Sequence, residues 1–427
     1  MHSYLSATLP RHQTRNIVLL FALAIAAVSG ACAQTFSIIF NLPLSANSPW
    51  GSLTMDAAGN LYGTTTLSNT DAGTAFELKN SRGSWLFNPL LTFTQPDGMT
   101  PYSGLTIGPG GALYGTTADG GTLNDGTVYV LRPPQTVCRS VSCPWSRTVV
   151  HSFGANGDGH FPYLGSLVFD SAGNMYGTTS EGGTFNQGTV FELSRSGDGN
   201  WTEKVLYSFA GGSDGSAPAS GITFDAAGNI YGTTEAGGNS GCGSSGCGTV
   251  YKLTPSGSGW TEAVIYKFSG ATDGYFPVGG VIFDPSGNMY GSTAQGGLNL
   301  GGTVFELSPN GGGWSFSLLY ALIQGKFGAG GPTGNLVLDS SGALLGTTIL
   351  DGANGVGNIF KLTHQDSNWT YTDLHDFTAF DDQDGEEPIG TPILDASGNL
   401  YGTTSGGGSQ ECSFEVQCGT LWKLTPQ

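Results

Sequence analysis

The densest group of side chains that could do chemistry is the segment Asp381-Asp-Gln-Asp-Gly-Glu-Glu387, which places five carboxylates within seven residues. Carboxylates this close repel one another unless water or a cation separates them, and hard cations such as Ca²⁺ prefer several oxygen ligands. Asp381, Asp382, Asp384 and Glu386 are therefore candidate Ca²⁺ ligands. The segment lacks the full Asp-x-Asp-x-Asp-Gly spacing of a strong calcium loop, so a solvated acidic loop is the alternative.

Acidic residues also recur singly in Gly-rich segments along the chain. They precede a glycine at Asp97, Asp158, Asp214 and Asp273, and they open Glu181-Gly-Gly and Glu235-Ala-Gly-Gly. If these segments share one face of the fold, that face is ringed with carboxylates that could bind a cation, a basic group or a polyhydroxyl ligand. The alternative is that each Asp-Gly closes a turn, with its carboxylate accepting hydrogen bonds from local backbone N–H groups. The recurrence favours the turn, because one binding site needs no repeated copies.

The sequence has a match to a nucleophile motif, but the match lacks the structural context that the motif requires. Gly211-Gly-Ser-Asp-Gly215 matches the Gly-x-Ser-x-Gly pattern of serine hydrolases, but it lies in a repeated Gly-rich segment, without the strand-to-helix turn that exposes such a serine. His151 and His375 fill a slot that Tyr207 and Tyr266 occupy elsewhere, which indicates packing. The sequence contains no His-Glu-x-x-His motif and no nucleotide-binding loop. We therefore assign no catalytic residue.

The charge balance excludes some partners. The 427 residues carry 32 acidic and 14 basic side chains, a net charge of −18. Residues 1–33 contain two Arg and no acid, so a chain that starts at Gln34 has 12 basic and 32 acidic side chains, or −20. Such a charge repels nucleic acid and anionic lipid and attracts cations or cationic partners. We expect no nucleic-acid partner.

The first 33 residues are typical of a secretory signal peptide. Arg11 and Arg15 precede an apolar run from Ile17 to Val28, and the small residues Ala31-Cys-Ala33 suit cleavage before Gln34. A lipoprotein signal acylated at Cys32 is the alternative. No later apolar run is long enough to span a bilayer. We expect a protein secreted to the periplasm or the cell exterior, with residues 34–427 as a single domain.

Six of the seven cysteines follow the predicted cleavage site, and they form three close pairs. The pairs are Cys138 with Cys143, Cys242 with Cys247, and Cys412 with Cys418. Each pair lies in a segment longer than its counterparts in other repeats, which suits local disulfides formed after export. A metal site is the alternative, but no pair has a second pair or a His at zinc-finger spacing.

The elements that must position these residues are repeats. The phrase Phe169-Asp-Ser-Ala-Gly-Asn-Met-Tyr-Gly-Thr-Thr179, followed by Gly188-Thr-Val-Phe-Glu-Leu193, is one of seven copies. The other six begin at Met55, Ile107, Phe224, Phe283, Leu338 and Leu394. A unit repeated at a nearly constant spacing of 52 to 62 residues indicates a fold built of stacked supersecondary elements.

Each repeat predicts four short strands. In the third copy they are 166–169, 174–179, 188–193 and 201–209, with a tight Asp-Gly turn between the first two. Four antiparallel strands per 50 to 60 residues are typical of a propeller blade. The fourth strand is missing after the last phrase, whereas residues 37–42 align with 204–209. The N-terminal strand is therefore predicted to complete the last blade and close the ring.

The repeats resemble those of the secreted bacterial GloVer-repeat proteins. That family is recognised by copies of a phrase like Asn229-Ile-Tyr-Gly-Thr-Thr234 with Gly248-Thr-Val-Tyr-Lys-Leu253. The resemblance covers residues 36–424, and the family has no assigned biochemical activity. Many members carry a C-terminal anchoring segment, whereas this chain stops at Gln427, which favours release.

The sequence thus predicts an all-β, seven-bladed propeller that is closed by its N-terminal strand and is expected to be monomeric. The favoured function is non-catalytic binding of a glycan or a protein, with or without Ca²⁺, through the acidic loop face. The alternative is a hydrolase or lyase that acts on an extracellular polymer or lactone with carboxylates and a divalent cation at the channel mouth.

Overall fold

The repeated phrase folds into the two inner strands of a sheet, and the tight turn between them explains its composition. In the third copy, Asp170 Oδ1 accepts hydrogen bonds from the backbone N–H groups of Ala172 (2.8 Å) and Asn174 (2.9 Å). Gly173 has a φ angle of 87°, a conformation that disfavours residues with a Cβ atom. The hydroxyl of Tyr176 donates to Asp170 Oδ2 at 3.1 Å. The predicted turn chemistry is confirmed.

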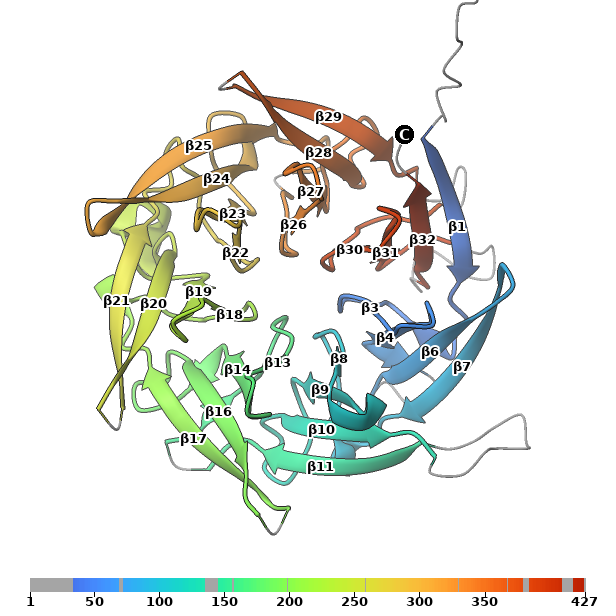
Figure 1. The fold of residues 1–427 in the computed structure, drawn as a ribbon. Coiled ribbons are helices and arrows are strands. Elements are labelled where there is room, and N and C mark those ends of the chain that lie inside the picture. The colour runs from blue at the N-terminus through green and yellow to red at the C-terminus, as the bar shows by residue number, and fades with distance from the viewer. Residues whose placement is uncertain are drawn as a thin grey trace, which may run out of the picture. The chain divides into compact units, whose positions relative to one another are not determined.

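The computed structural model describes residues 34–425, except for 69–71, 135–144, 156, 198, 258, 329, 367, 379–383 and 409–417. In this part of the chain, seven four-stranded antiparallel sheets surround a central axis as the blades of a propeller (Figure 1). The predicted all-β, seven-bladed architecture is confirmed. The predicted signal peptide, residues 1–33, lies outside the described residues, so its cleavage stays a prediction.

In six blades the strands run from the axis outward in chain order, and in the last blade the outer strand comes from the N-terminal end of the chain. The innermost strands are β3 (Thr54–Met55), β8 (Thr106–Ile107), β13 (Val168–Phe169), β18 (Thr223–Phe224), β22 (Ile282–Phe283), β26 (Val337–Leu338) and β30 (Ile393–Leu394). The second strands are β4 (Leu61–Thr65), β9 (Leu113–Thr117), β14 (Met175–Thr179), β19 (Ile230–Thr234), β23 (Met289–Thr293), β27 (Leu344–Thr348) and β31 (Leu400–Thr404). The third strands are β6 (Thr74–Ser81), β10 (Thr127–Arg132), β16 (Thr189–Arg195), β20 (Thr249–Ser256), β24 (Leu300–Asn310), β28 (Asn358–Gln365) and β32 (Thr420–Thr425). The outer strands are β7 (Ser84–Thr92), β11 (Ser146–Ser152), β17 (Trp201–Ser208), β21 (Gly259–Lys267), β25 (Gly313–Ile323), β29 (Asn368–Asp376) and β1 (Thr35–Asn41).

Short elements lie in the loops between these strands. They are the strand pairs β2 (Ala46–Asn47) with β5 (Leu67–Ser68) and β12 (Gly159–His160) with β15 (Glu181–Gly182), and the 3₁₀ turns η1 (Gln95–Asp97), η2 (Pro109–Gly111), η3 (Gly212–Asp214) and η4 (Ser240–Ser245). In each strand pair, the loop that enters a blade pairs with the loop between its second and third strands. Single bridges such as Ser216 with Ala236 do the same in other blades. The two loop sets therefore share one face of the ring, as predicted.

The N-terminal strand closes the ring. β1 pairs antiparallel with β32, from Thr35 opposite Thr425 to Asn41 opposite Thr420. The last blade thus consists of three strands from the C-terminal end of the chain and one from the N-terminal end (Figure 1). This closure leaves no sheet edge between the first and the last blade.

The invariant glycine of the phrase is required by an aromatic ring on the third strand. A Cβ atom on Gly177 would lie 2.7 Å from Cζ of Phe191, and one on Gly232 would lie 2.7 Å from Cζ of Tyr251. Phe191 and Tyr251 are fully buried. The group that approaches this glycine is therefore a core side chain.

Hydrophobic clusters between neighbouring blades form the core. In the cluster between the third and fourth blades, Tyr176 packs with Ile222 and Tyr251. The hydroxyl of Thr178 donates to the carbonyl of Ser220 in the next blade at 2.7 Å. The hydroxyl of Tyr176, by contrast, donates within its own blade, to Asp170 and Glu192.

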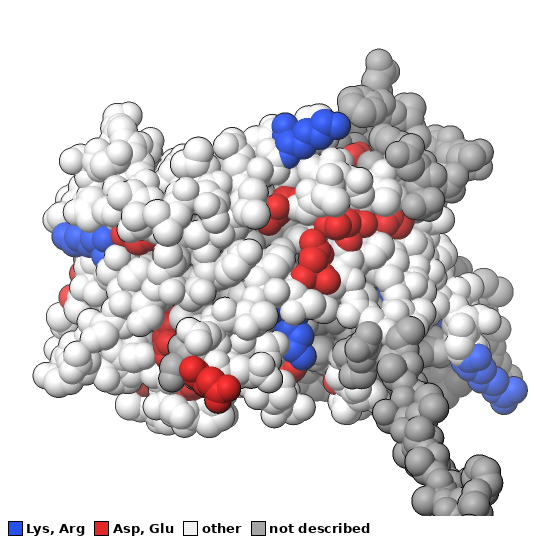
Figure 2. All heavy atoms as spheres, turned by 90° about the horizontal axis from the view of Figure 1, so that it is seen from above, with Lys and Arg blue, Asp and Glu red and all other residues white. Residues whose placement is uncertain are grey.

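The outer surface carries few charges. Most atoms on the side shown in Figure 2 belong to residues other than Asp, Glu, Lys and Arg, in keeping with a charged fraction of 11%. Among the residues described, no helix has the length and apolar character needed to cross a membrane.

Candidate functional site

The carboxylates of the recurring Asp-Gly pairs attach each loop to the outer strand of its own blade. Asp214 shows the arrangement: its Oδ1 atom accepts the hydroxyl of Tyr207 at 2.7 Å, and its Oδ2 atom accepts the backbone N–H of Ala210 at 2.6 Å. Tyr266 does the same for Asp273 at 3.0 Å, and His151 Nε2 lies 2.9 Å from Asp158. Four of these carboxylates belong to buried residues, namely Asp97, Asp158, Asp273 and Asp384. The arrangement agrees with the turn interpretation of these residues.

The first blade uses a different partner. Leu91 occupies the position that Tyr or His fills in the second to sixth blades, and Asp97 pairs instead with the guanidinium of Arg147 on the outer strand of the next blade. Thr94 also donates its hydroxyl to Asp97 at 2.7 Å. The carboxylate is held in place although the aromatic partner is missing.

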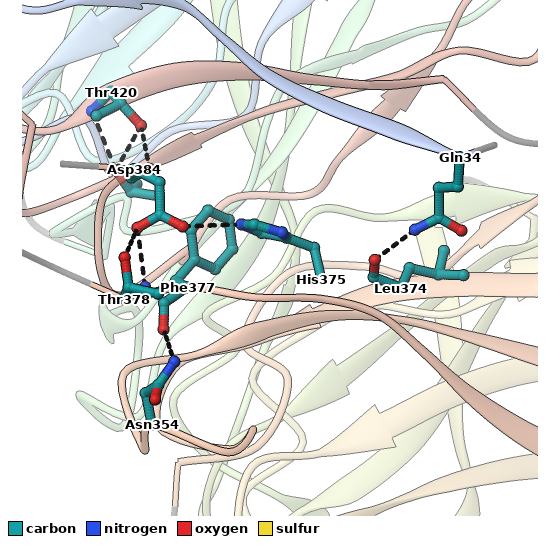
Figure 3. A network of polar contacts seen from close by, with 9 residues as sticks. Gln34, Asn354, Leu374, His375, Phe377, Thr378, Asp384 and Thr420 are labelled. Atoms are coloured by element: carbon teal, nitrogen blue, oxygen red, sulfur yellow. Dashed lines mark hydrogen bonds and ion pairs between the residues drawn. The ribbon is translucent and has the colours of Figure 1, made fainter. Parts of the chain in front are cut away.

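The acidic segment before Pro388 is only partly described. Asp381 and Asp382 lie outside the described residues. Asp384 is held by His375 Nε2 at 2.9 Å and by the backbone N–H and hydroxyl of Thr378, both at 2.8 Å (Figure 3). Glu386 is half-buried, and burial followed by the charge of Glu387 raises the pKa of its carboxyl. Within the described ranges, no group of three His, Cys, Asp or Glu side chains is placed to hold a metal ion. The Ca²⁺ site stays a prediction.

One predicted disulfide is present as expected. Cys242, in η4, is bonded to Cys247, which follows η4, between the second and third strands of the fourth blade. Cys418 is also disulfide-bonded, and its predicted partner Cys412 lies outside the described residues. Cys138 and Cys143 lie outside them as well.

A group of aromatic rings marks the mouth of the central channel, on the face that carries the paired loops. The residue that follows the proline at each blade entry is Trp50, Tyr102 and Tyr163 in the first three blades. In the other four blades it is Ala219, Val278, Thr333 and Ile389. Trp50, Val278, Thr333 and Ile389 line the channel. The mouth is therefore aromatic on one side only.

The rings contact one another in an unbroken row. The ring centroids of Trp50 and Tyr102 lie 5.2 Å apart, those of Tyr102 and Tyr163 lie 5.0 Å apart, and Phe161 stacks on Tyr163 at 5.6 Å. All four side chains are partly exposed. We call Trp50, Tyr102, Phe161 and Tyr163 the aromatic arc. Edge-to-face and stacked contacts at these distances stabilise the arc as a preformed surface.

The backbone before the proline has an unusual conformation. Phe161 has a φ angle of 57°, and its equivalents Ser48, Thr100, Ala217, Phe276 and Glu387 have values from 52° to 56°. Left-handed conformations cost free energy in residues other than Gly. Because the conformation recurs in six blades, it belongs to the architecture of the blade entry. It fixes the direction of the residue after the proline.

Two carboxylates lie beside the arc. The Asp119 carboxylate accepts the hydroxyl of Thr100 at 2.5 Å, and its charge adds to burial in raising the pKa of Tyr102. Glu235 is half-buried, and burial raises the pKa of its carboxyl. Burial, then Tyr102 and the charge of Glu235, raise the pKa of Tyr163 to about 12. Both tyrosines are therefore neutral hydrogen-bond donors at physiological pH.

The channel below the mouth is narrow and neutral. Its cavity volume is about 100 Å³, and its walls include Ser52, Ser166, Ser220, Asn335 and Thr391. Several of these residues bond around the axis: Asn335 accepts the N–H of Gly280 at 2.7 Å, and Ser52 accepts the N–H of Thr391 at 2.9 Å. A cavity of this size admits a few water molecules, so a larger ligand would be held at the mouth.

Two other half-buried acids lie where the outer strands of neighbouring blades meet. Glu203 faces His151 and Asp158 of the preceding blade, and Glu262 faces Asp214 of its preceding blade. Burial and the like charges of Asp158 and Asp214 raise the pKa of the Glu203 and Glu262 carboxyls to about 7. One carboxylate oxygen of each is buried without a hydrogen-bond partner in the described part of the chain. These acids belong to the contact between blades and lie apart from the arc.

The fifth and sixth blades meet at the strongest departure from the repeat. Asp351, Asp373 and Asp376 line a pocket with Tyr320 and Tyr371, whose rings stack at 4.5 Å. Burial, with the charge of Asp376, raises the pKa of Asp373 to about 6, although the hydrogen bond from Asn358 lowers it. The sequence did not point to these residues, although Asp351, Tyr371, Asp373 and Asp376 each replace a residue of another type in the other repeats.

The predicted ligand-binding residues do not form one site. Asp97, Asp158, Asp214 and Asp273 attach loops around the ring, and Glu181 is exposed in β15. Glu235 lies beside the arc. The arc itself was missed because attention fell on the repeated phrase. Its signal is present in the printed sequence as the residue after each blade-entry proline, where three consecutive copies differ from the other four.

Comparisons with known proteins identify the repeat. A family model described as the Gloeobacter/Verrucomicrobia repeat matches residues 25–245 and 240–427. A comparison with curated proteins finds no match.

Solved structures of similar shape are distant. A candidate 6-phosphogluconolactonase from Bacteroides uniformis is 15% identical with a TM-score of 0.47, and the match covers 76% of this chain and 83% of that one. A candidate glucose dehydrogenase from Thermus thermophilus is 15% identical with a TM-score of 0.42, and the match covers 92% of this chain and 100% of that one. A protein of unknown function from Dyadobacter fermentans is 12% identical with a TM-score of 0.44, covering 92% and 98%. Likeness at this level carries no argument about function.

Proposed function

The chain belongs to the Gloeobacter/Verrucomicrobia repeat family, and from this premise we propose that it is a non-catalytic binding protein that engages a glycan at the mouth of its channel. The observation that carries the proposal is the aromatic arc. Propeller architecture does not require these rings, because four of the seven blades have Ala219, Val278, Thr333 or Ile389 at the same position. Trp50, Tyr102 and Tyr163 are therefore candidates for a role beyond folding.

The chemistry of the arc suits a sugar. Partly exposed Trp and Tyr rings offer apolar faces for the C–H groups of a pyranose, and the Tyr102 and Tyr163 hydroxyls can donate hydrogen bonds to its oxygens. Asp119 and Glu235 add acceptors for sugar hydroxyls at the rim. Aromatic surface with a few polar groups at its edge is the usual composition of a small-molecule site. Because the rings already contact one another, binding requires little ordering of side chains.

A protein ligand is the competing occupant of the same face. Exposed apolar side chains lie on the loops around it, with Leu123 54% and Phe185 57% exposed. The enzyme alternative would use the acids before Pro388, of which Asp381 and Asp382 lie outside the described residues. Secretion, which would bring the protein to extracellular glycans, rests on the predicted signal peptide.

The test is a glycan array probed with the chain from Gln34 onward, followed by calorimetric titration of the best hit. We expect Tyr163→Ala and Trp50→Ala to weaken binding by tenfold or more, since each tenfold is about 1.4 kcal/mol and one stacked ring contributes about that much. Phe185→Ala is the matched control, because it removes an exposed aromatic ring from the same face outside the arc. Its affinity should equal that of the unmodified protein.

Two results would overturn the proposal. One is an array without any hit, and capture of a polypeptide ligand would then favour the competing occupant. The other is a glycan that binds Trp50→Ala and Tyr163→Ala as tightly as the unmodified protein. Thermal unfolding of each variant ensures that lost binding does not reflect a lost fold.

A further inference from the structure

Glu235 is an exception to the repeat at the edge of the aromatic arc. It occupies the position directly after the Thr-Thr pair, where the other copies have Thr66, Ala118, Ser180, Ala294, Ile349 and Ser405. The backbone confirms the equivalence: the N–H of Glu235 donates to the carbonyl of Ala217 at 2.9 Å, as the N–H of Ser180 does to Phe161 at 3.1 Å. Only the fourth copy has an acid here.

This position changes one of the sequence interpretations. In the sequence, Glu181-Gly-Gly and Glu235-Ala-Gly-Gly both begin a Gly-rich loop with an acid, but Ala236 is the structural equivalent of Glu181. Thr234 Oγ1 donates to the carbonyl of Ala236 at 2.9 Å, just as Thr179 Oγ1 donates to Glu181 at 2.9 Å. Glu181 is exposed, whereas Glu235 lies one residue nearer the strand and is half-buried. The two acids therefore face different surroundings.

Among the described residues, the Glu235 carboxylate has no bonding partner. In other blades the side chain at this position bonds back to the blade entry, as Ser180 Oγ does to the carbonyl of Phe161 at 2.9 Å. An ionised carboxylate cannot donate such a bond. Burial is the one cause that raises the pKa of Glu235, and in the described ranges its carboxylate has neither an ion pair nor a hydrogen bond. A recessed carboxylate without a partner is stabilised by a ligand that brings a positive charge.

The neighbouring ring completes the arrangement. The ring centroid of Tyr102, which follows the proline at the entry of the second blade, lies 6.3 Å from that of Phe161 at the entry of the third blade. By the repeat, Tyr163 has the same relation to Ala217 at the entry of the fourth blade, and the N–H of Glu235 donates to the carbonyl of Ala217. The Glu235 carboxylate therefore lies beside the last ring of the arc, in keeping with the contribution of its charge to the raised pKa of Tyr163. A cation located there meets both a carboxylate and the face of a tyrosine, and the two attractions add. The net charge of −18 attracts a cationic ligand over a longer range. Asp119, at Tyr102, is already engaged by Thr100.

We propose that the glycan bound by the arc contains amino sugars with free ammonium groups, and that Glu235 binds one such group while Tyr163 stacks on the ring that carries it. This inference rests on the proposed function, because it names the ligand class of the same site. The ammonium donates hydrogen bonds to the Glu235 carboxylate and supplies the charge that this carboxylate lacks. Acidic polysaccharides are correspondingly excluded from the site.

The experiment compares two ligands that differ only at nitrogen. The probes are a β-1,4-linked glucosamine oligomer and the N-acetylglucosamine oligomer of the same length, titrated by calorimetry at a pH where the free amine is protonated. We expect the glucosamine oligomer to bind about tenfold more tightly, in line with about 1.4 kcal/mol for one charge-assisted hydrogen bond. Glu235→Gln should abolish the preference for the free amine.

The control variant is Glu181→Gln, which removes an exposed acid from the corresponding loop of the third blade. It should keep the preference for the free amine. If both oligomers bind equally and Glu235→Gln changes neither, the inference is overturned while glycan binding at the arc stands. If neither oligomer binds but a neutral or acidic glycan binds in a manner that requires Tyr163, the ligand class is wrong and the proposed function again survives. If no glycan binds, both proposals fail together.

Discussion

Replacing Glu262 with Gln should stabilise the protein at mildly alkaline pH and leave it unchanged at acidic pH. Glu262 lies where the outer strands of the third and fourth blades meet, against the carboxylate of Asp214. Burial, then the charge of Asp214, raise its pKa from an ordinary value of 4.5 to about 7, while Lys267 opposes the shift. One carboxylate oxygen is buried without a described partner. Above the raised pKa, the folded protein therefore holds a costly charge.

The sign follows from proton linkage. Between about pH 4.5 and 7 the folded state binds more protons than the unfolded state, so the free energy of unfolding falls as the pH rises through this window. A shift of this size would cost about 3 kcal/mol for a fully buried group, at about 1.4 kcal/mol per pH unit. Since Glu262 is only half-buried, solvent screening reduces the cost to about 1–2 kcal/mol. Gln keeps the shape and can donate its amide to Asp214.

The assay is urea unfolding of the unmodified protein and of Glu262→Gln at about pH 5 and about pH 8. We expect equal stability at the lower pH and a gain of about 1–2 kcal/mol for the variant at the higher pH. Glu203→Gln should behave alike, because Glu203 has the same raised pKa at the contact between the second and third blades. Glu181→Gln, at an exposed acid, should show no pH-dependent difference. A variant less stable than the unmodified protein at the higher pH would refute the reasoning.

Two further predictions concern the repeated phrase. Gly177→Ala should lower the free energy of unfolding by about 1–3 kcal/mol, since the new methyl group would lie 2.7 Å from Cζ of Phe191. Urea unfolding measures the loss, and an unchanged midpoint would contradict this explanation of the recurring glycine. Asp225→Ala should cost about 1–3 kcal/mol at neutral pH through lost turn hydrogen bonds. Although burial opposes ionisation of Asp225, hydrogen bonds from Asn229 and Tyr231 lower its pKa from 3.8. Near this pKa the folded state therefore binds fewer protons than the unfolded state. The difference in free energy of unfolding between the variant and the unmodified protein should thus shrink as the pH falls below 3.8. A difference that grows on acidification would be inconsistent with this carboxylate role.

The repeat made the fold predictable. Asp170, Gly173 and Tyr176 recur in most copies because together they build one turn: the carboxylate caps the backbone and accepts the tyrosine hydroxyl, and the glycine takes the left-handed conformation. Seven copies of this unit, with the fourth strand of the last blade supplied by the N-terminus, fit a closed ring of seven blades. Local chemistry and global architecture agree at each copy, so a single sequence is sufficient to predict them.

The candidate site was less predictable because its residues show themselves by departing from the repeat. Tyr163 and Glu235 are far apart in sequence and come together only through the packing of the third and fourth blades. Loop acids such as Asp158 were conspicuous in the sequence, but the outer strand of their own blade already engages them. Recurrence indicates which residues the architecture needs, and the remaining positions need a structure to show which of them are neighbours.

The most direct test of glycan binding at the channel mouth is a crystal structure of the protein soaked with the best glycan hit. The account predicts sugar rings on the exposed faces of Trp50, Tyr102 and Tyr163, with an amino group within hydrogen-bonding distance of Glu235. Sugar bound at another surface, with the aromatic arc free, would contradict it.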